Sequence, residues 1–189
     1  MDVLSHFGQC QIAHFACHGQ PVFSDPSQSR LLLEDWESNL LMVSNIISLK
    51  LKTPKLAYLS ACYAADNPTG TLFDEGIHLI GACQLAGFIH SIGTLWRIND
   101  EHSVTVSRDV YATMSQPSGV IDVQRASEGV HKAIRRLREV TREIPGFSKL
   151  CPDDPLVWAP YVHIGPECKE GGALSETIRK NLSGRLWEG

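Results

Sequence analysis

Two short stretches of this chain place a histidine or a cysteine directly after an apolar segment. Residues 11–16 run into His18 and Gly19, and residues 56–61 run into Cys62. Both segments read as buried strands, and residues that follow such strands lie at the edge of a sheet, where open α/β proteins place their ligands. An imidazole and a thiol at that edge can act as base and nucleophile, which is the chemistry of a cysteine protease.

The spacing of the two segments allows them to be parallel neighbours. Parallel strands lie about 4.8 Å apart and need a crossover of at least about a dozen residues, which the interval from Gly19 to Pro54 supplies. A free thiol has a pKa of about 8.5, so only about 3 % of it is thiolate at neutral pH, and a nearby imidazolium raises that share. The pattern predicts that His18 activates Cys62, and that Cys17 points to the opposite face, into the core.

Four blocks of sequence, in this order along the chain, resemble the CHAT domain, a caspase-like family related to separases, metacaspases and gingipains. A further block, residues 73–79, is most similar to the fungal members. The resemblance implies an α/β fold, a caspase-like three-layer sandwich with a mostly parallel central sheet. The four blocks are residues 14–19 (HFACHG), 59–62 (LSAC), 93–100 (GTLWRIND) and 158–165 (WAPYVHIG).

The resemblance also implies the catalytic roles. His18 would be the base and Cys62 the nucleophile, and the backbone N–H groups of Gly19 and Cys62 would form the oxyanion hole. Such a donor stabilises the developing charge by about 3 to 4 kcal/mol. The implied chemistry needs no cofactor. A metal site built from His14, Cys17 and His18 is not expected, because structural zinc needs four ligands and no second cluster is visible.

Three residues are candidates for the substrate pocket: Ser60, Asp74 and Glu75. In relatives that cleave after Arg or Lys, an aspartate lies two residues before the nucleophile, and here that position is Ser60. The resemblance therefore implies a preference for small or apolar side chains, unless Asp66, Asp74 or Glu75 supplies the acid. Asp74 and Glu75 have a plainer interpretation, because acids gather at helix N-termini for their dipole.

The chain departs from the family pattern in two places, which keeps a second function open. Tyr63 follows the nucleophile, where many members carry an acidic or amide residue. Members also carry further sheet and helix before the histidine strand, so we expect residues 1–166 to be a CHAT domain without its N-terminal part. The leading hypothesis is a CHAT-like cysteine endopeptidase. The alternative is a catalytically silent CHAT module that acts as a scaffold or signalling partner.

Composition limits the partners. A chain of 189 residues with a net charge of −4 fits one domain without a basic surface for nucleic acid. No apolar run reaches the length of a membrane span. The six cysteines show no CxxC pairing, which favours reduced thiols and a cytoplasmic location. We expect a protein or peptide substrate, with a missing N-terminal segment or a repeat-containing protein as further candidate partners.

Periodicity and turn residues predict the remaining elements. Residues 96–100, which follow a strand, could border a substrate site, and Asp100 is expected to cap the next helix. Residues 167–189 are polar and rich in glycine, so we expect a mobile tail. The expected strands are residues 31–35, 88–96 and 156–164, and the expected helices are residues 39–49, 73–85, 100–114 and 120–143.

Overall fold

A computed structural model describes most of the chain, and strands and helices alternate along it. The predicted tail, residues 167–189, lies outside the described residues, as do Asp66 and Asp74. The described residues are 3–7, 9–20, 22, 24–49, 51–60, 62–63, 75–96, 98–143 and 155–166.

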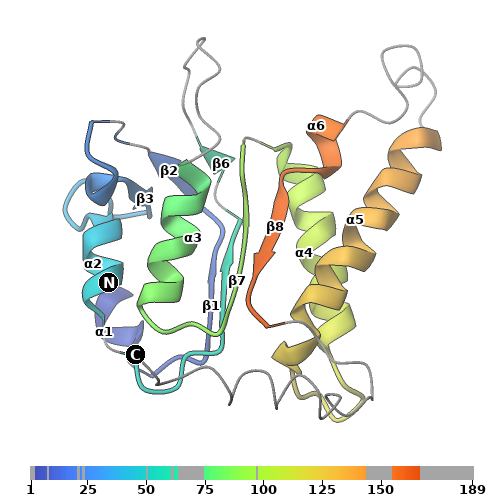
Figure 1. Ribbon diagram of the computed structural model, residues 1–189, viewed down its shortest axis with the longest axis horizontal. Coiled ribbons are helices and arrows are strands. Elements are labelled where there is room, and N and C mark those ends of the chain that lie inside the picture. Colours follow the sequence, from blue (N-terminus) through green and yellow to red (C-terminus); the bar gives the residue numbers. More distant parts are fainter. Residues whose placement is uncertain are drawn as a thin grey trace, which may run out of the picture.

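The main sheet contains β1 (Ile12–Phe15), β5 (Leu56–Leu59), β7 (His90–Thr94) and β8 (Tyr161–Ile164), in the order β1-β5-β7-β8. The first three strands are parallel, and β8 runs antiparallel to β7 (Figure 1). All four residues of β5 are buried, as expected for a strand covered on both faces. The predicted, mostly parallel central sheet is therefore confirmed.

A smaller sheet continues the first two strands of the main sheet. It contains β4 (Leu41–Met42), β3 (Arg30–Leu32), β2 (His18–Gln20) and β6 (Cys62–Tyr63), in that order. Strand β2 follows β1 in the chain, β6 follows β5, and both pairs are parallel with the same offset along the sequence. The β2–β6 pair is thus an extension of the β1–β5 pair in unchanged register.

Helices cover both faces of the main sheet, which gives three layers (Figure 1). One face carries α1 (Val3–Phe7), α2 (Val43–Ser48) and α3 (Glu75–Leu85), and the other carries α4 (Asp100–Met114) and α5 (Ala126–Glu143). Successive residues of a strand point to opposite faces. Accordingly Leu59 belongs to the core that includes α3, and Tyr58 to the core that includes α4.

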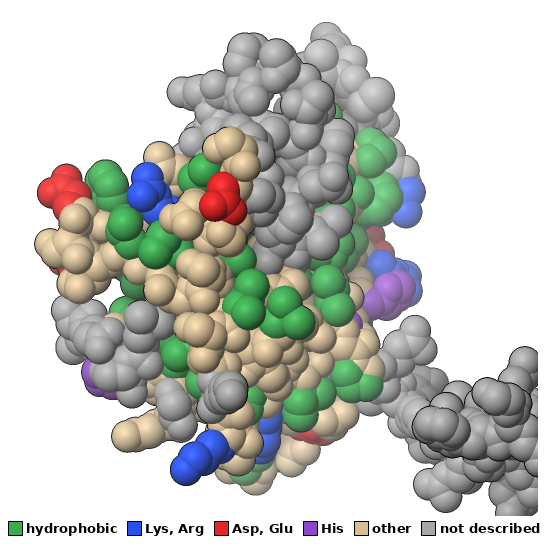
Figure 2. All heavy atoms as spheres, turned by 60° about the vertical axis from the view of Figure 1, so that its left-hand side comes forward, with side chains coloured by type: hydrophobic (Ala, Val, Ile, Leu, Met, Phe, Trp, Pro, Cys, Tyr) green, Lys and Arg blue, Asp and Glu red, His purple; other side chains and the backbone are tan. Residues whose placement is uncertain are grey.

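The side with α1, α2 and α3 is turned toward the viewer in Figure 2. Hydrophobic side chains lie there among backbone and other uncharged side chains, and charged side chains are few. Leu40 and Ile47 are among the exposed apolar residues of the α2 region, and Leu85 ends α3. Single exposed apolar residues are normal on a protein surface, so none of them by itself marks a binding surface.

Helix α4 begins one residue earlier than the capping prediction implies. Asn99, not Asp100, is the N-cap: its side-chain oxygen accepts a hydrogen bond of 2.8 Å from the backbone N–H of Glu101. Asp100 is the first residue of the helix.

Several other predicted elements are shorter in the structure, including the strands expected at residues 31–35 and 88–96, which are Arg30–Leu32 and His90–Thr94. The long helix begins at Ala126, because Ile121 bridges to Ser115 and a short 3-10 helix, η2 (Val123–Arg125), precedes it. The last strand begins at Tyr161, after the short helix α6 (Pro155–Trp158), and it follows Pro160, which has no N–H to donate.

The helix predicted for residues 39–49 also begins late, at Val43, because Leu41 and Met42 pair with β3 instead. A second 3-10 helix, η1 (Pro26–Gln28), precedes β3. The predicted helix boundary at residue 73 lies outside the described residues, and α3 begins at Glu75.

Candidate active site

The strand register brings the two predicted catalytic residues together. His18 on β2 and Cys62 on β6 are partners in a parallel ladder, so their backbones lie side by side on adjacent strands. The His18 side chain is exposed. The sequence pattern predicts His18 just after a strand, whereas in the structure His18 is the first residue of β2. The prediction that the two strands are parallel neighbours is confirmed. The catalytic roles of His18 and Cys62 stay a prediction.

Gly19 lies next to this pair, inside the small sheet. It is buried and pairs with Leu31 of β3 on one side and with Tyr63 of β6 on the other. The oxyanion-hole role of the N–H groups of Gly19 and Cys62 stays a prediction.

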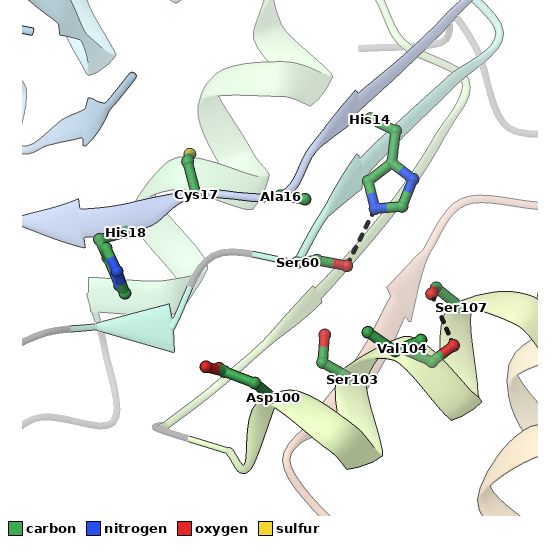
Figure 3. A pocket seen from close by; sticks show the side chains of 9 residues that line it. All are labelled: His14, Ala16, Cys17, His18, Ser60, Asp100, Ser103, Val104 and Ser107. Atoms are coloured by element: carbon green, nitrogen blue, oxygen red, sulfur yellow. Dashed lines mark hydrogen bonds between the residues drawn. The ribbon is translucent and has the colours of Figure 1, made fainter. Parts of the chain in front are cut away.

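A cavity of about 260 Å³ lies beside the β2–β6 pair, where β1 and β5 end and α4 begins (Figure 3). Three elements that are distant in sequence therefore meet at the carboxyl edge of the parallel strands, where ligands of open α/β sheets bind. The lining residues are His14, Ala16, Cys17, His18, Ser60, Asp100, Ser103, Val104 and Ser107.

Two residues on one side of the cavity are hydrogen-bonded to each other. The Nε2 atom of His14 lies 3.0 Å from the Oγ atom of Ser60, and the imidazole ring packs 4.6 Å from the ring of Tyr58 and 5.6 Å from that of Tyr111. Burial lowers the pKa of His14 below its usual value, so its ring is neutral at pH 7. In the sequence, His14 is a candidate only for a metal ligand. The alternation of residues 14, 16 and 18 along one strand face was the signal for its place here.

Three of the cysteines, Cys10, Cys17 and Cys83, are poor nucleophiles. The thiol of Cys17 points away from His18 (Figure 3) and packs against the core on the α3 side, as predicted. Burial raises the pKa of Cys17 to about 11 and that of Cys83 to about 12, and it also raises the pKa of Cys10. These three thiols are therefore protonated at neutral pH.

The predicted pocket residues divide between the cavity and the undescribed part of the chain. Ser60 lines the cavity. Asp74 and the side chain of Glu75 lie outside the described residues. Asp100 also lines the cavity, and whether residues 96–100 border a substrate site stays a prediction. Trp96 of that segment is held by a hydrogen bond of 2.9 Å from its Nε1 to the carbonyl of Leu156.

Within the described residues, no three His, Cys, Asp or Glu side chains gather closely enough to hold a metal ion. His14 and His18 do line the same cavity, but the Cys17 thiol that would join them points the other way. In the same part of the chain, no helix is both long enough and apolar enough to cross a membrane.

Comparison with known proteins identifies one matching family. The family model for the CHAT domain matches residues 1–166, a range that includes the strands, the cavity and all four sequence blocks described above. None of the curated proteins compared with the chain matches it.

Proposed function

Because the chain belongs to the CHAT domain family, a caspase-like peptidase family, we propose that it is a cysteine endopeptidase of protein substrates, with Cys62 as nucleophile and His18 as base. The observation that carries the proposal is the register of β2 and β6, in which His18 is the direct partner of Cys62. Residues paired in this way project from the same face of a sheet, which favours contact between imidazole and thiol. The cavity beside the pair offers room for a substrate side chain.

The proposed reaction uses the two side chains and water. His18 removes the proton from the Cys62 thiol, and the thiolate attacks the carbonyl carbon of the scissile peptide bond. The C–N bond then breaks, and the amine leaves with the proton that the imidazolium returns. His18 next removes a proton from water, the hydroxide attacks the thioester, and the acid is released as Cys62 regains its proton.

The other described thiols support this assignment. At a pKa of about 11, only about one in ten thousand Cys17 thiols is ionised at neutral pH. Burial raises the pKa of Cys83 further, to about 12, and it also raises the pKa of Cys10. A thiol reagent at neutral pH would therefore discriminate strongly against these three residues.

The experiment is to measure iodoacetamide alkylation from pH 5 to pH 10, with peptide mapping of the labelled cysteine. We expect Cys62 to react first, and we expect His18→Ala to move its reactivity profile toward an ordinary thiol pKa of about 8.5. Cys10→Ala and His131→Ala are the matched controls, since His131 is exposed on α5. Overlapping profiles for wild type and His18→Ala would refute the pairing, as would unchanged labelling of Cys62→Ala.

A scaffold or signalling role is the second candidate, and Tyr63 favours it. Tyr63 pairs with Gly19 in β6, next to the His18–Cys62 pair, where many members of the family carry an acidic or amide residue. This departure from the family pattern at the residue after the nucleophile is what favours a catalytically silent chain. If a folded protein shows a reactive Cys62 but cuts no member of a peptide library, while Tyr63→Asn does cut, then Tyr63 silences the native chain and the scaffold role is the function.

A further inference from the structure

The strand ladder that leads to His18 and Cys62 is interrupted just before them. The β1–β5 ladder ends with the pair Phe15 and Leu59. The β2–β6 ladder begins with the pair His18 and Cys62, and the described residues between the two ladders belong to no strand. Strand β6 is two residues long and lies at the edge of the small sheet, with β2 as its one neighbour among the described strands. Contacts across the gap therefore decide how firmly Cys62 is held opposite His18.

One side-chain hydrogen bond crosses this gap. The Nε2 atom of His14 on β1 lies 3.0 Å from the Oγ atom of Ser60, the first residue after β5 (Figure 3). The ladder partner of His14 is Tyr58, so Ser60 is its diagonal neighbour, two residues further along and on the same face. The hydrogen bond thus joins β1 to the segment that leads into Cys62.

Two tyrosine rings hold the imidazole that makes this hydrogen bond. The ring centroid of His14 lies 4.6 Å from that of Tyr58 on β5 and 5.6 Å from that of Tyr111 on α4. The two tyrosine rings are stacked on each other, with centroids 5.9 Å apart. The imidazole is therefore fixed from two layers of the fold, and it offers Ser60 a partner in a fixed place.

We propose that His14 and Ser60 are positioning residues, whose hydrogen bond closes the gap between the two ladders and holds Cys62 in register with His18. The inference rests on the proposed function, because it concerns the alignment of that base and that nucleophile. Proton transfer requires the thiol within about 2.6 to 3.2 Å of the imidazole, or one water away, so a small displacement of β6 slows it. Neither positioning residue exchanges a proton with the substrate.

The plainer interpretation is that the hydrogen bond only adds stability to the β1–β5 pair. Variants that differ in little but the hydrogen bond separate the two roles. Ser60→Thr keeps the hydroxyl, and Ser60→Val replaces it by a methyl group of nearly the same shape. His14→Gln keeps a hydrogen-bonding group, and His14→Leu does not. Ser107→Val is the control, because Ser107 lines the same cavity but donates to the carbonyl of Val104, 3.0 Å away in its own helix.

The first test is the rate at which iodoacetamide alkylates Cys62, measured from pH 5 to pH 10. We expect Ser60→Val and His14→Leu to lower the rate at pH 7 by about 3- to 10-fold, as the loss of one hydrogen bond implies, and to move the profile toward that of an ordinary thiol. Ser60→Thr and His14→Gln should stay within about twofold of wild type, as should Ser107→Val. Overlapping profiles for Ser60→Thr and Ser60→Val would overturn the proposal, even if Ser60→Val were the less stable protein.

The second test does not depend on a reactive thiol. Amide hydrogen exchange, followed by NMR, reports the opening of β2 and β6 through the protected amides of residues 18–20 and 62–63. These amides should exchange about 3- to 10-fold faster in Ser60→Val than in Ser60→Thr, while those of β7 keep their rates. Equal exchange in the two variants would refute the positioning role.

The two tests together separate this proposal from the proposed function. If His18→Ala leaves the reactivity of Cys62 unchanged while exchange responds to Ser60→Val as expected, the alignment of β2 with β6 stands and the base–nucleophile pairing fails. If His18→Ala shifts the reactivity profile and Ser60→Val changes neither reactivity nor exchange, the pairing stands and the positioning role is refuted.

Discussion

Two pairs of histidines occupy opposite ends of the main sheet. At the carboxyl end of β1, His14 and His18 line an open cavity, and the His18 side chain is exposed. At the amino end of β7, His90 is fully buried, and its Nδ1 lies 3.1 Å from the Nε2 of His163 on β8, with the two rings 5.3 Å apart. One pair faces space that a ligand can enter, and the other fills space between strands.

The difference shows that position at the sheet, and not residue type, decides what a histidine can do here. Burial and the neighbouring His90 lower the pKa of His163 to about 4, and burial lowers that of His90. A ring held neutral by its surroundings is a poor proton acceptor near pH 7. The His90–His163 pair is therefore a structural contact between β7 and β8, whereas His18 has the exposure that proton transfer to a substrate requires.

The strongest test of this difference is to replace one histidine at each end of the sheet, His18 or His90, by alanine. If the proposed function holds, His18→Ala lowers kcat/KM for peptide hydrolysis at pH 7 by at least about 100-fold, because the proposed base is lost, while stability changes by less than about 0.5 kcal/mol. His90→Ala should lower the free energy of unfolding by about 2 to 4 kcal/mol, because it leaves a cavity and an unpaired His163. Urea unfolding and peptide cleavage assays measure both. Equal effects of the two variants on stability would contradict the distinction.

A glycine at the buried end should also be intolerant of substitution. Gly165 has φ of 153°, and a Cβ there would lie 2.7 Å from the carbonyl oxygen of Ile89 and 2.9 Å from Nδ1 of His90. Gly165→Ala is therefore expected to lower the free energy of unfolding by about 2 to 3 kcal/mol. The control is Gly81→Ala in α3, where a Cβ meets nothing within 4 Å and helix propensity favours alanine by up to about 1 kcal/mol. If Gly165→Ala and Gly81→Ala both unfold at the same urea concentration as wild type, the packing of Gly165 against Ile89 and His90 leaves room for a Cβ, and this prediction is wrong.

The buried pair also predicts a pH dependence of stability. Because the pKa values of His90 and His163 are lowered in the folded state, the unfolded chain binds more protons below its usual histidine pKa of about 6.5. The contribution of these two neutral histidines to stability is therefore fully present above about pH 6.5 and is lost as the pH falls toward about 4. After allowance for the partial exposure of His163, we expect a loss of about 1 to 2 kcal/mol.

Urea unfolding at pH 7.5 and pH 4.5 measures this loss. His163→Gln keeps a hydrogen-bonding group but removes one titrating ring, so its stability should fall less between the two pH values than that of wild type. His131→Gln is the matched control, since His131 is exposed on α5. An identical pH dependence for wild type and His163→Gln would exclude this source of acid sensitivity.

The smallest expected effect is a change in the pKa of His14, which lines the cavity like His18 but has its pKa lowered by burial like His90 and His163. Burial is the cause of its lowered pKa, so Ser60→Ala should leave the pKa nearly unchanged. Tyr111→Ala removes a ring whose centroid lies 5.6 Å from that of His14 and admits water, so it should raise the pKa toward the ordinary value. NMR titration of the imidazole measures both. A larger response to Ser60→Ala than to Tyr111→Ala would mean that the hydrogen bond, not burial, controls this ring.

The sequence by itself determined the elements whose signal is local. The apolar run of β5, the periodic α4 and α5, and the His18 and Cys62 positions at the ends of neighbouring parallel strands all follow from residue type and spacing. The predicted boundaries of helices were less accurate where a strand pairing or a capping hydrogen bond fixed the end of the element. Leu41 and Met42 pair with β3 in place of extending a helix, and Asn99 replaces Asp100 as the cap because its side chain reaches the N–H of Glu101.

Tertiary structure alone decided which distant side chains meet. His14 and Ser60 are 46 residues apart and His90 and His163 are 73 apart, yet each pair is in contact. Asp100 lines the cavity because α4 packs on one face of the main sheet and begins beside the carboxyl ends of β1 and β5. Local patterns report whether a residue prefers water or the core. Which residues then face each other depends on strand register and on the packing of whole layers, and many weak contacts along the chain fix these together.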